Sequence, residues 1–456
     1  MKKNFNLFQL NVDRIPGFDA LGPDDFAPAT AEEREAMVES RASVSYWRDA
    51  ARRFKANKVS MAALALFLLI FLFSYLGPLF IPYNYSDQYR GSGKLGPGEY
   101  SKSEQIIKKA EGTCDGFFAT SLIPGSLTNL GRNTTYYFKY GGTTYSFYNE
   151  SAVSNAVLLF NASSPAPLSL ITEADLDAGS LDKAAPLEYS TGAVDPSAPN
   201  TQELKLIKRV FPHVFGTDSS GRDLMARTMY GGRVSIAVGI IAALIVLIIG
   251  SVYGSVSGLA GGRVDFVMMR IVDIIYSVPD VLIVLLLQVV LKAPLQAWLD
   301  ASATDFARLM SNLGVGIISI FITFAALYWV GMSRIVRGQV LQLKEQEFVT
   351  AANALGVPGR RIVKRHLLPN CVGQLIIATC LQIPSAIFLE SFLSFLGLGV
   401  SIPMTSLGSL CSDALDTITL YPYRLLFPGI ILTLLVLSLN LVGDGIRDAL
   451  DPRLKK

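Results

Sequence analysis

The sequence has little charge, almost no histidine and few cysteines. Only 17% of its 456 residues are charged, two are histidine, and 51% are hydrophobic. The four cysteines show no C-x-x-C spacing, so a structural metal site is not indicated. The net charge of +3 comes from scattered basic residues, which excludes nucleic acid as a partner. This balance is typical of a membrane protein.

The chain also lacks the motifs of nucleotide hydrolysis and of common catalytic sites. It contains no G-x-x-x-x-G-K-[ST] phosphate loop, and Gly356-Val-Pro-Gly359 lacks the Lys-Ser/Thr pair that would hold phosphates and magnesium. Neither H-E-x-x-H nor G-x-S-x-G occurs. The sequence therefore predicts a protein that is not an enzyme by itself.

Six apolar runs are long enough to cross a bilayer, for which about 20 residues suffice. The predicted spans are 61–81, 234–259, 274–291, 315–335, 375–396 and 425–442. Five basic residues between 48 and 58 precede the first span, with Asp49 as the single acidic residue, so the positive-inside rule places the N-terminus in the cytoplasm. An even number of spans returns the C-terminus to the same side. This orientation places three arginines on the outer side, just before the second span: Arg222, Arg227 and Arg233. Asp218 and Asp223 partly balance their charge.

About 130 polar residues between the first two spans must lie outside the cytoplasm. Residues 134–140 and 143–148 are β-prone and flank Gly141-Gly142, which predicts a hairpin. The sequence also predicts a helix over 102–111, a strand over 156–160 and a loop over 163–199. Cys114 and Cys411 both fall outside and could pair, although a free or buried thiol is an equal alternative.

The segment from Glu345 to Pro358 is a helix that ends in a turn. Phe348, Ala352 and Leu355 recur at i, i+4 and i+7, which predicts one shallow apolar stripe that another protein can approach. Gly356 is expected at C′, with Pro358 opening a second, basic helix. The residues alone leave a second interpretation open, a solvated basic loop at the lipid headgroups.

Carboxylates inside apolar spans are costly and usually face an aqueous path or a partner. Asp280 and Glu390 are such residues. Glu390 lies near the outer boundary, where we expect solvation to lower the cost, so packing or gating is favoured there. Asn440 is expected to hydrogen-bond across helices.

Two further patterns have structural interpretations. Asp223 and Arg227 are spaced i, i+4 and are expected to pair on a surface helix that begins near Ser219 or Ser220 as N-cap. The glycines at 250, 254 and 258 predict a close contact between helices.

Thr350-Ala-Ala-x-x-x-Gly356, followed by His366-x-Leu-Pro369, resembles the loop motif of membrane subunits of binding-protein-dependent ATP-binding cassette importers. Three more blocks, within 215–235, 390–399 and 427–453, resemble the second (C-type) membrane subunit of oligopeptide and dipeptide permeases. The resemblance covers 215–456 and the first span, and the insertion is longer than the loop usual in the family.

The resemblance implies that the loop forms a coupling helix that docks on an ATPase subunit. The positions that would make this contact are Glu347, Phe348, Ala351, Ala352, Leu355, Gly356, Val357 and Pro358. Asp280, Glu390 and Asn440 are the candidates for the translocation path or its gate. No catalytic and no metal-binding residue is expected.

The expected fold is an all-α polytopic membrane protein with six transmembrane helices and a small α+β or β-rich extracytoplasmic insertion between helices 1 and 2. Its parts are a cytoplasmic segment 1–59, helix 1 at 60–82, the insertion 83–215, a permease core 216–445 with coupling loop 336–370, and a tail 446–456.

The implied function is import of oligopeptides or dipeptides across a bacterial or archaeal cell membrane. The implied partners are a second permease subunit, two cytoplasmic ATP-binding subunits that bind ATP and magnesium, and an extracytoplasmic peptide-binding protein. This chain itself needs no cofactor. The alternatives are a nickel complex or glutathione as cargo, or a membrane receptor or secondary carrier, although we see no inverted repeat of the kind such carriers show.

Overall fold

The structure is a computed structural model of the whole chain. It describes residues 46–88, 92–113, 117–121, 132–140, 143–151, 157–161, 169–178, 190–191, 201–203, 205–207, 210–302, 304–400 and 404–450. The chain divides by its contacts into residues 1–52 and 53–456. Of the first unit, the described part is the beginning of helix α2 (Tyr46–Ala56). Everything below concerns the second unit.

Six helices in the described part of the chain are long and apolar enough to cross a membrane, as predicted. They span Lys58–Leu79, Leu224–Ala260, Asp280–Ala301, Val315–Leu343, Gly359–Phe395 and Tyr423–Leu450. The number of candidate spans agrees with the prediction, and the chain is a multi-pass membrane protein.

Most spans extend beyond the apolar runs that predicted them, because polar residues continue the helices. The helices of this unit are α3 (Lys58–Leu76), η4 (Gly77–Leu79), α6 (Leu224–Ala260), α7 (Gly262–Ser277), α8 (Asp280–Ala301), α9 (Asp305–Leu313), α10 (Val315–Thr323), the π-helix η6 (Phe324–Tyr328), α11 (Trp329–Leu343), α12 (Glu347–Ala354), α13 (Gly359–Ile362), the π-helix η7 (Val363–Leu367), α14 (Leu368–Phe395), α15 (Leu407–Leu415) and α16 (Tyr423–Leu450).

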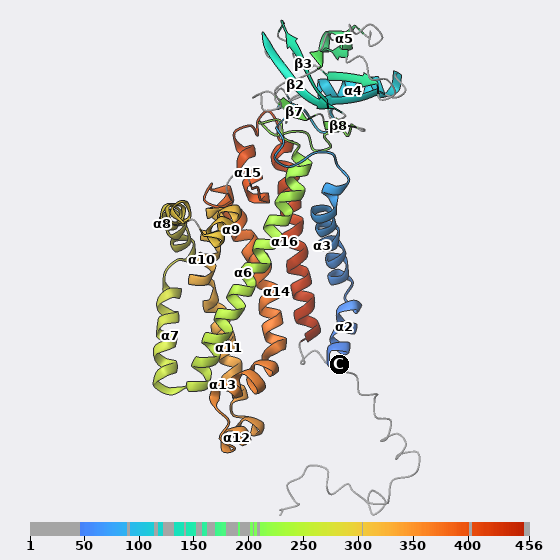
Figure 1. Cartoon of the computed structure of the whole chain (residues 1–456). Helices are drawn as coiled ribbons and strands as arrows, with labels where there is room; N and C mark the ends of the chain where they lie inside the picture. Colours follow the sequence, from blue (N-terminus) through green and yellow to red (C-terminus); the bar gives the residue numbers. More distant parts are fainter. Residues whose placement is uncertain are drawn as a thin grey trace, which may run out of the picture. The chain divides into compact units, whose positions relative to one another are not determined.

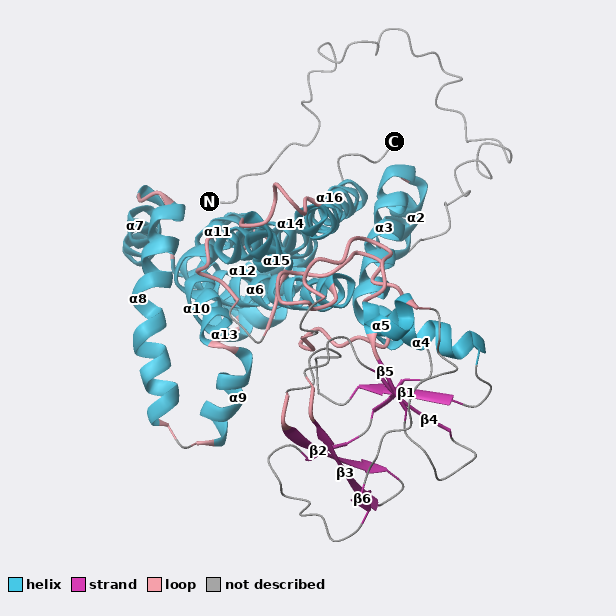
Figure 2. Ribbon diagram, turned by 90° about the horizontal axis from the view of Figure 1, so that it is seen from above, coloured by secondary structure: helices cyan, strands magenta, loops and turns pink. Residues whose placement is uncertain are grey.

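The predicted third span, 274–291, is wrong at its start because the chain bends within it. Helix α7 ends at Ser277 and α8 begins at Asp280. Between them Val278 is extended, with ψ of 137°, as a residue before proline prefers, and Pro279 has no N–H to continue the helix. Figures 1 and 2 together show α8 running across the direction of α7.

Helix α6 is the central element of the bundle and packs against α11, α14 and α3 (Figure 1). The glycines at 250, 254 and 258 face α11, where a side chain at Gly254 would collide with the Ser333 carbonyl. The predicted close helix contact is therefore confirmed. Beside it lies an apolar core that includes Ile320, Phe324 and Val336, all fully buried.

Between the first two spans the structure describes two short helices and eight strands. The predicted helix over 102–111 is α4, and the predicted hairpin is β2 paired with β3 in antiparallel register. The loop expected over 163–199 is wrong in part, because Thr172 caps α5 there with a capping box. The elements are α4 (Lys102–Thr113), β1 (Phe117–Ser121), β2 (Thr134–Tyr140), β3 (Thr143–Asn149), β4 (Val157–Asn161), β5 (Ser169–Ile171), α5 (Glu173–Asp177), β6 (Ser190–Thr191), β7 (Thr201–Glu203) and β8 (Lys205–Ile207).

These strands pair in two sets. One follows the order β5-β4-β1-β8 and the other β6-β3-β2-β7, where β7 joins β2 in parallel. Each set also pairs strands that are distant in sequence, β1 with β8 and β2 with β7, and these pairings could not be read from the local pattern.

Candidate functional site

The loop between α11 and α14 carries α12, whose end is built as predicted. Gly356 has φ of 73° and lies at C′. Its N–H donates to the Asn353 carbonyl at 2.9 Å, and the Val357 N–H donates to the Ala352 carbonyl at 3.1 Å. These two bonds form a Schellman motif, which glycine permits because it accepts a positive φ. Pro358 is the N-cap of α13 rather than its first residue.

The predicted apolar stripe on α12 is divided between two faces. Ala352 is buried together with Val349 in the main core, whereas Phe348 is 41% and Leu355 84% exposed. Ala351 is exposed as well. The exposed apolar residues are thus Phe348, Ala351, Ala354 and Leu355. Of these, Phe348, Ala351 and Leu355 are spaced i, i+3 and i+7. Helical periodicity permits both assignments of the alanine, and packing against the core decided between them.

A cavity of about 550 Å³ opens where α7 and α8 meet. Its wall combines apolar residues with a few polar groups, as binding sites for small solutes do. The lining residues are Ile275, Tyr276, Ser277, Val278, Pro279, Asp280, Ile283, Leu327, Tyr328, Val330, Gly331 and Gln382. Tyr328 lies in a π-helix, an insertion that often occurs at functional sites.

Of the three predicted path residues, only Asp280 lines this cavity. Its side chain is exposed, and Oδ1 accepts a hydrogen bond from the Val281 N–H at 2.9 Å. Asn440 is exposed on α16 and donates to the Val436 carbonyl of its own helix at 3.0 Å, so the expected bond across helices is not the one observed.

Glu390 is fully buried, so the expected solvation at the membrane boundary is wrong. Three hydroxyls stabilise its carboxylate instead: Ser394 donates to Oε1 at 2.7 Å, and Ser235 and Ser391 donate to Oε2 at 2.9 and 3.3 Å. Since Ser235 belongs to α6 and also receives the Leu407 N–H at 3.4 Å, Glu390 connects α14, α6 and the start of α15.

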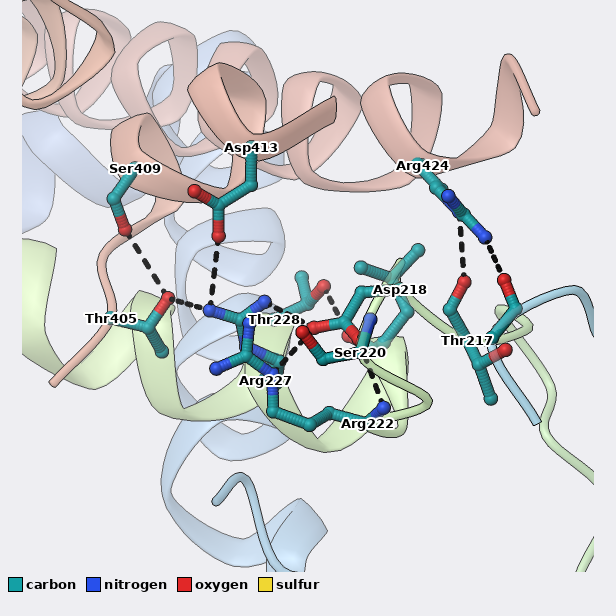
Figure 3. Close-up of polar contacts among 12 residues, drawn as sticks. Thr217, Asp218, Ser220, Arg222, Arg227, Thr228, Thr405, Ser409, Asp413 and Arg424 are labelled. Atoms are coloured by element: carbon teal, nitrogen blue, oxygen red, sulfur yellow. Dashed lines mark hydrogen bonds and ion pairs between the residues drawn. The ribbon is translucent and has the colours of Figure 1, made fainter. Parts of the chain in front are cut away.

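A network of buried charges surrounds the start of α6 (Figure 3). The pairing expected between Asp223 and Arg227 on a surface helix is wrong. Asp223 is itself the N-cap and accepts the Ala226 N–H at 2.6 Å, so the helix begins at Leu224. Arg227 is buried and pairs with Asp218 at 2.5 Å and Asp413 at 3.2 Å.

The same network reaches α16 through a second arginine. Arg424 donates from Nε to the Thr217 carbonyl at 3.0 Å and from Nη2 to the Gly93 carbonyl at 2.5 Å. Arg222 holds Asp218 at 2.7 Å. Arginine and aspartate therefore fasten the segment before α6 to α15 and α16, and the partners could not be identified from sequence because they lie up to 331 residues apart.

A buried histidine joins α4 to the start of α6. His213 Nδ1 lies 2.7 Å from Asp223 Oδ2 and Nε2 lies 3.3 Å from Glu104 Oε1. Tyr83 stacks on the imidazole and donates to Glu104 at 2.7 Å. Burial alone would lower the pKa of His213, but the hydrogen bonds and charges of Asp223 and Glu104 outweigh it and raise the pKa to about 9. No sequence motif marks this cluster.

Cys411 is a buried thiol of α15, and burial raises its pKa to about 11. Its suggested partner, Cys114, lies outside the described residues, so their pairing stays a prediction.

Comparison with known proteins adds two family models. Residues 250–456 match the binding-protein-dependent transport system inner membrane component, and residues 45–97 match the N-terminal TM domain of oligopeptide transport permease C.

Among curated proteins, the oligopeptide transport system permease protein OppC of Bacillus subtilis is 33% identical over 431 residues, covering 94% of this chain and 97% of that protein. The dipeptide transport system permease protein DppC of the same organism is 44% identical over 245 residues, covering 54% and 70%. OppC of Escherichia coli is 44% identical over 241 residues, covering 53% and 72%. A solved inward-facing MetNI methionine ABC transporter chain shares 17% identity at a TM-score of 0.38, covering 50% of this chain and 98% of its own.

Proposed function

This chain belongs to the oligopeptide and dipeptide permease family of binding-protein-dependent transport systems, and we propose that it is a membrane subunit of an ATP-driven peptide importer. The observation that carries this proposal is the similarity to a curated oligopeptide permease over 94% of the chain, a share too large to leave out the insertion. In this role the chain forms part of the translocation path and hydrolyses no ATP itself.

The exposed stripe of α12 supports the contact with an ATPase. Phe348 and Leu355 present apolar surface, while Val349 and Ala352 beneath them fix the helix to the main core. A helix held in this way transmits a push without bending, which a coupling element requires. Glu347, Gly356, Val357 and Pro358 complete the contact at the two ends of α12, and ATP and magnesium bind to the partner subunits.

The path is proposed to pass the cavity at the α7–α8 bend. Asp280 supplies its charge, since a carboxylate in a membrane helix needs an aqueous or polar neighbour. Glu390 serves in packing or gating rather than in contact with the peptide, because its hydroxyl partners enclose it completely. Asn440, exposed on α16, stays a candidate for the path.

The topology follows the charges. The positive-inside rule puts both termini in the cytoplasm and therefore α12 on the ATPase side and the insertion outside. The assembly we propose contains a second, different permease, two ATPases and an extracytoplasmic peptide-binding protein. Residues 83–215 would then form an α+β module that contacts the binding protein or caps the outer mouth. Deletion of residues 100–200 without loss of uptake or of receptor affinity would remove that role.

The test is reconstitution of the full complex in proteoliposomes, with uptake and ATP hydrolysis measured together. Binding protein plus peptide should stimulate hydrolysis in the wild type. Leu355→Asp places a charge in the exposed apolar stripe. It should lower uptake roughly tenfold, because the interface with the ATPase loses an apolar contact residue. Gly356→Asp, which adds a side chain at C′ of the same helix, should also uncouple hydrolysis from uptake.

The matched control is Leu420→Asp, which changes a leucine that is 76% exposed and lies outside the loop. It should leave uptake unchanged. Wild-type uptake in Leu355→Asp and Gly356→Asp would exclude the coupling role, and a chain that purifies without any ATPase would contradict the importer itself.

A further inference from the structure

Two arginines of α11 bind two aspartates of α7. Arg337 donates from Nε and Nη2 to both oxygens of Asp265, at 2.6 Å each, which is the bidentate geometry of a strong, directional pair. Arg334 donates to Asp273 at 2.8 Å. Both arginines lie in the C-terminal half of the candidate span Val315–Leu343. The Arg334 and Asp273 side chains are 38% and 54% exposed, whereas Arg337 and Asp265 are 32% and 13% exposed.

The two pairs diverge along α7. The arginines are three residues apart, or about 4.5 Å along α11, whereas the aspartates are eight residues apart, or about 12 Å along α7. One side chain therefore reaches toward each end of α7. Two ion pairs that diverge in this way oppose sliding of α7 along α11 in either direction. They therefore hold the two helices in one register.

Helix α7 is also attached to α6. Met269 and Ile275 pack beside Ile249 and Tyr253 of α6, and Ser257 of α6 donates a hydrogen bond to Asp265. Val272 is the single buried residue of α7, packed against Trp329 and Val330. Tyr253 adds one hydrogen bond, to the Met268 carbonyl at 2.8 Å. Elsewhere the helix exposes large apolar side chains, such as Phe266 at 64%. The ion pairs are thus the polar attachment of α7 to α11, beside its contacts with α6.

The two ion pairs lie between α12 and the cavity. Helix α11 ends at Leu343 and α12 begins at Glu347, after only three residues. At the other end, the Arg334 guanidinium lies over the Tyr276 ring, 4.4 Å from its centroid, and Tyr276 lines the cavity. Val330 and Gly331 of α11 line the cavity directly, and Arg334 connects a displacement of α11 to the opposite, α7 side of its wall at Tyr276.

We propose that Arg334 and Arg337, with Asp273 and Asp265, are positioning residues that transmit movement of α12 to the cavity wall at the α7–α8 bend. This inference rests on the proposed function, and it goes beyond it by assigning the transmission to four named side chains. The ion pairs make α7 follow α11, so that the bend carrying Asp280 moves with the ATPase contact.

The experiment uses the complete reconstituted complex and counts peptides transported per ATP hydrolysed. The double variant Asp265→Asn/Asp273→Asn keeps the size of both side chains and removes their charge. It should still show stimulated hydrolysis, while peptides per ATP fall roughly fivefold or more, the lower end of usual coupling between sites. Reversal of one pair, Asp265→Arg with Arg337→Asp, should recover part of the loss relative to Arg337→Asp alone.

The control Asp300→Asn/Asp305→Asn changes two aspartates whose hydrogen bonds, to Gln296 and Arg308, are exposed. It should leave peptides per ATP unchanged. The inference is overturned if intact complex with Asp265→Asn/Asp273→Asn transports as many peptides per ATP as the wild type. If the wild-type complex hydrolyses ATP but takes up no peptide, the proposed function fails instead, so the two failures are distinguishable.

Discussion

The buried histidine cluster predicts that α4 separates from the start of α6 as the pH rises. At neutral pH the protonated His213 donates from Nδ1 to Asp223 and forms an ion pair with Glu104 through Nε2. A neutral imidazole keeps only one N–H. The shorter bond is to Asp223, which also caps α6, so deprotonation should break the contact with Glu104 and release α4.

The size of this effect follows from the pKa of His213, which is raised from 6.5 to about 9 in the folded chain. A raised histidine pKa stabilises the folded state fully below 6.5, and the contribution is lost as the pH rises through about 9. The difference corresponds to roughly 3 kcal/mol, an upper limit because the neutral ring keeps one hydrogen bond. The pKa of Glu104 is lowered, since the bonds from His213 and Tyr83 outweigh its burial, so its own contribution is lost only in acid, below its usual 4.5.

Hydrogen exchange of the α4 amides, corrected for the intrinsic rate at each pH, measures this release. In the wild-type complex, protection of Lys102–Thr113 should fall by up to about 100-fold between pH 6.5 and 9.5. In His213→Gln it should be low throughout and independent of pH, while the amides of α16 serve as an internal control. If α4 shows the same pH dependence in both proteins, His213 is not the group responsible.

Two further pairs of substitutions test the packing of the bundle. Gly254→Val places a side chain against the Ser333 carbonyl and should lower the melting temperature and the yield of assembled complex. Gly331→Val changes a glycine with open space around it and should lower neither. Equal melting temperatures of the two variants would contradict the close contact between α6 and α11. Glu390→Leu leaves buried hydroxyls without their acceptor and should lower the stability by about 1–3 kcal/mol, whereas Glu390→Gln keeps an acceptor and should lower it less. Thermal melting of the purified complex measures the difference, and the reverse order would refute the hydroxyl arrangement.

The features that were predicted correctly are local ones. Six spans were counted because about 20 apolar residues in a row suffice for a crossing whatever surrounds them. The end of α12 at Gly356 and the hairpin of β2 and β3 were identified because caps and tight turns depend on neighbours in the chain. Membership of the permease family was recognisable for the same reason, since its motifs are short and continuous.

The features that were predicted wrongly depend on partners far away in the chain. Spacing suggested Asp223 for Arg227, but the arginine pairs with Asp218 and Asp413, and Asp223 caps the helix and binds His213. In the same way Ala352 was assigned to the exposed stripe of α12, although it is buried in the main core.

The sequence by itself determined how many candidate spans the chain has, where α12 ends and which family the chain belongs to, because hydropathy, capping and motifs act over a few residues. Only the tertiary structure decided which side of α12 is exposed, that Glu390 is enclosed by hydroxyls and that Arg334 and Arg337 bind α7. A buried charge binds whichever partner the fold brings within reach, and that choice depends on distances in space that the spacing of residues along a chain does not contain.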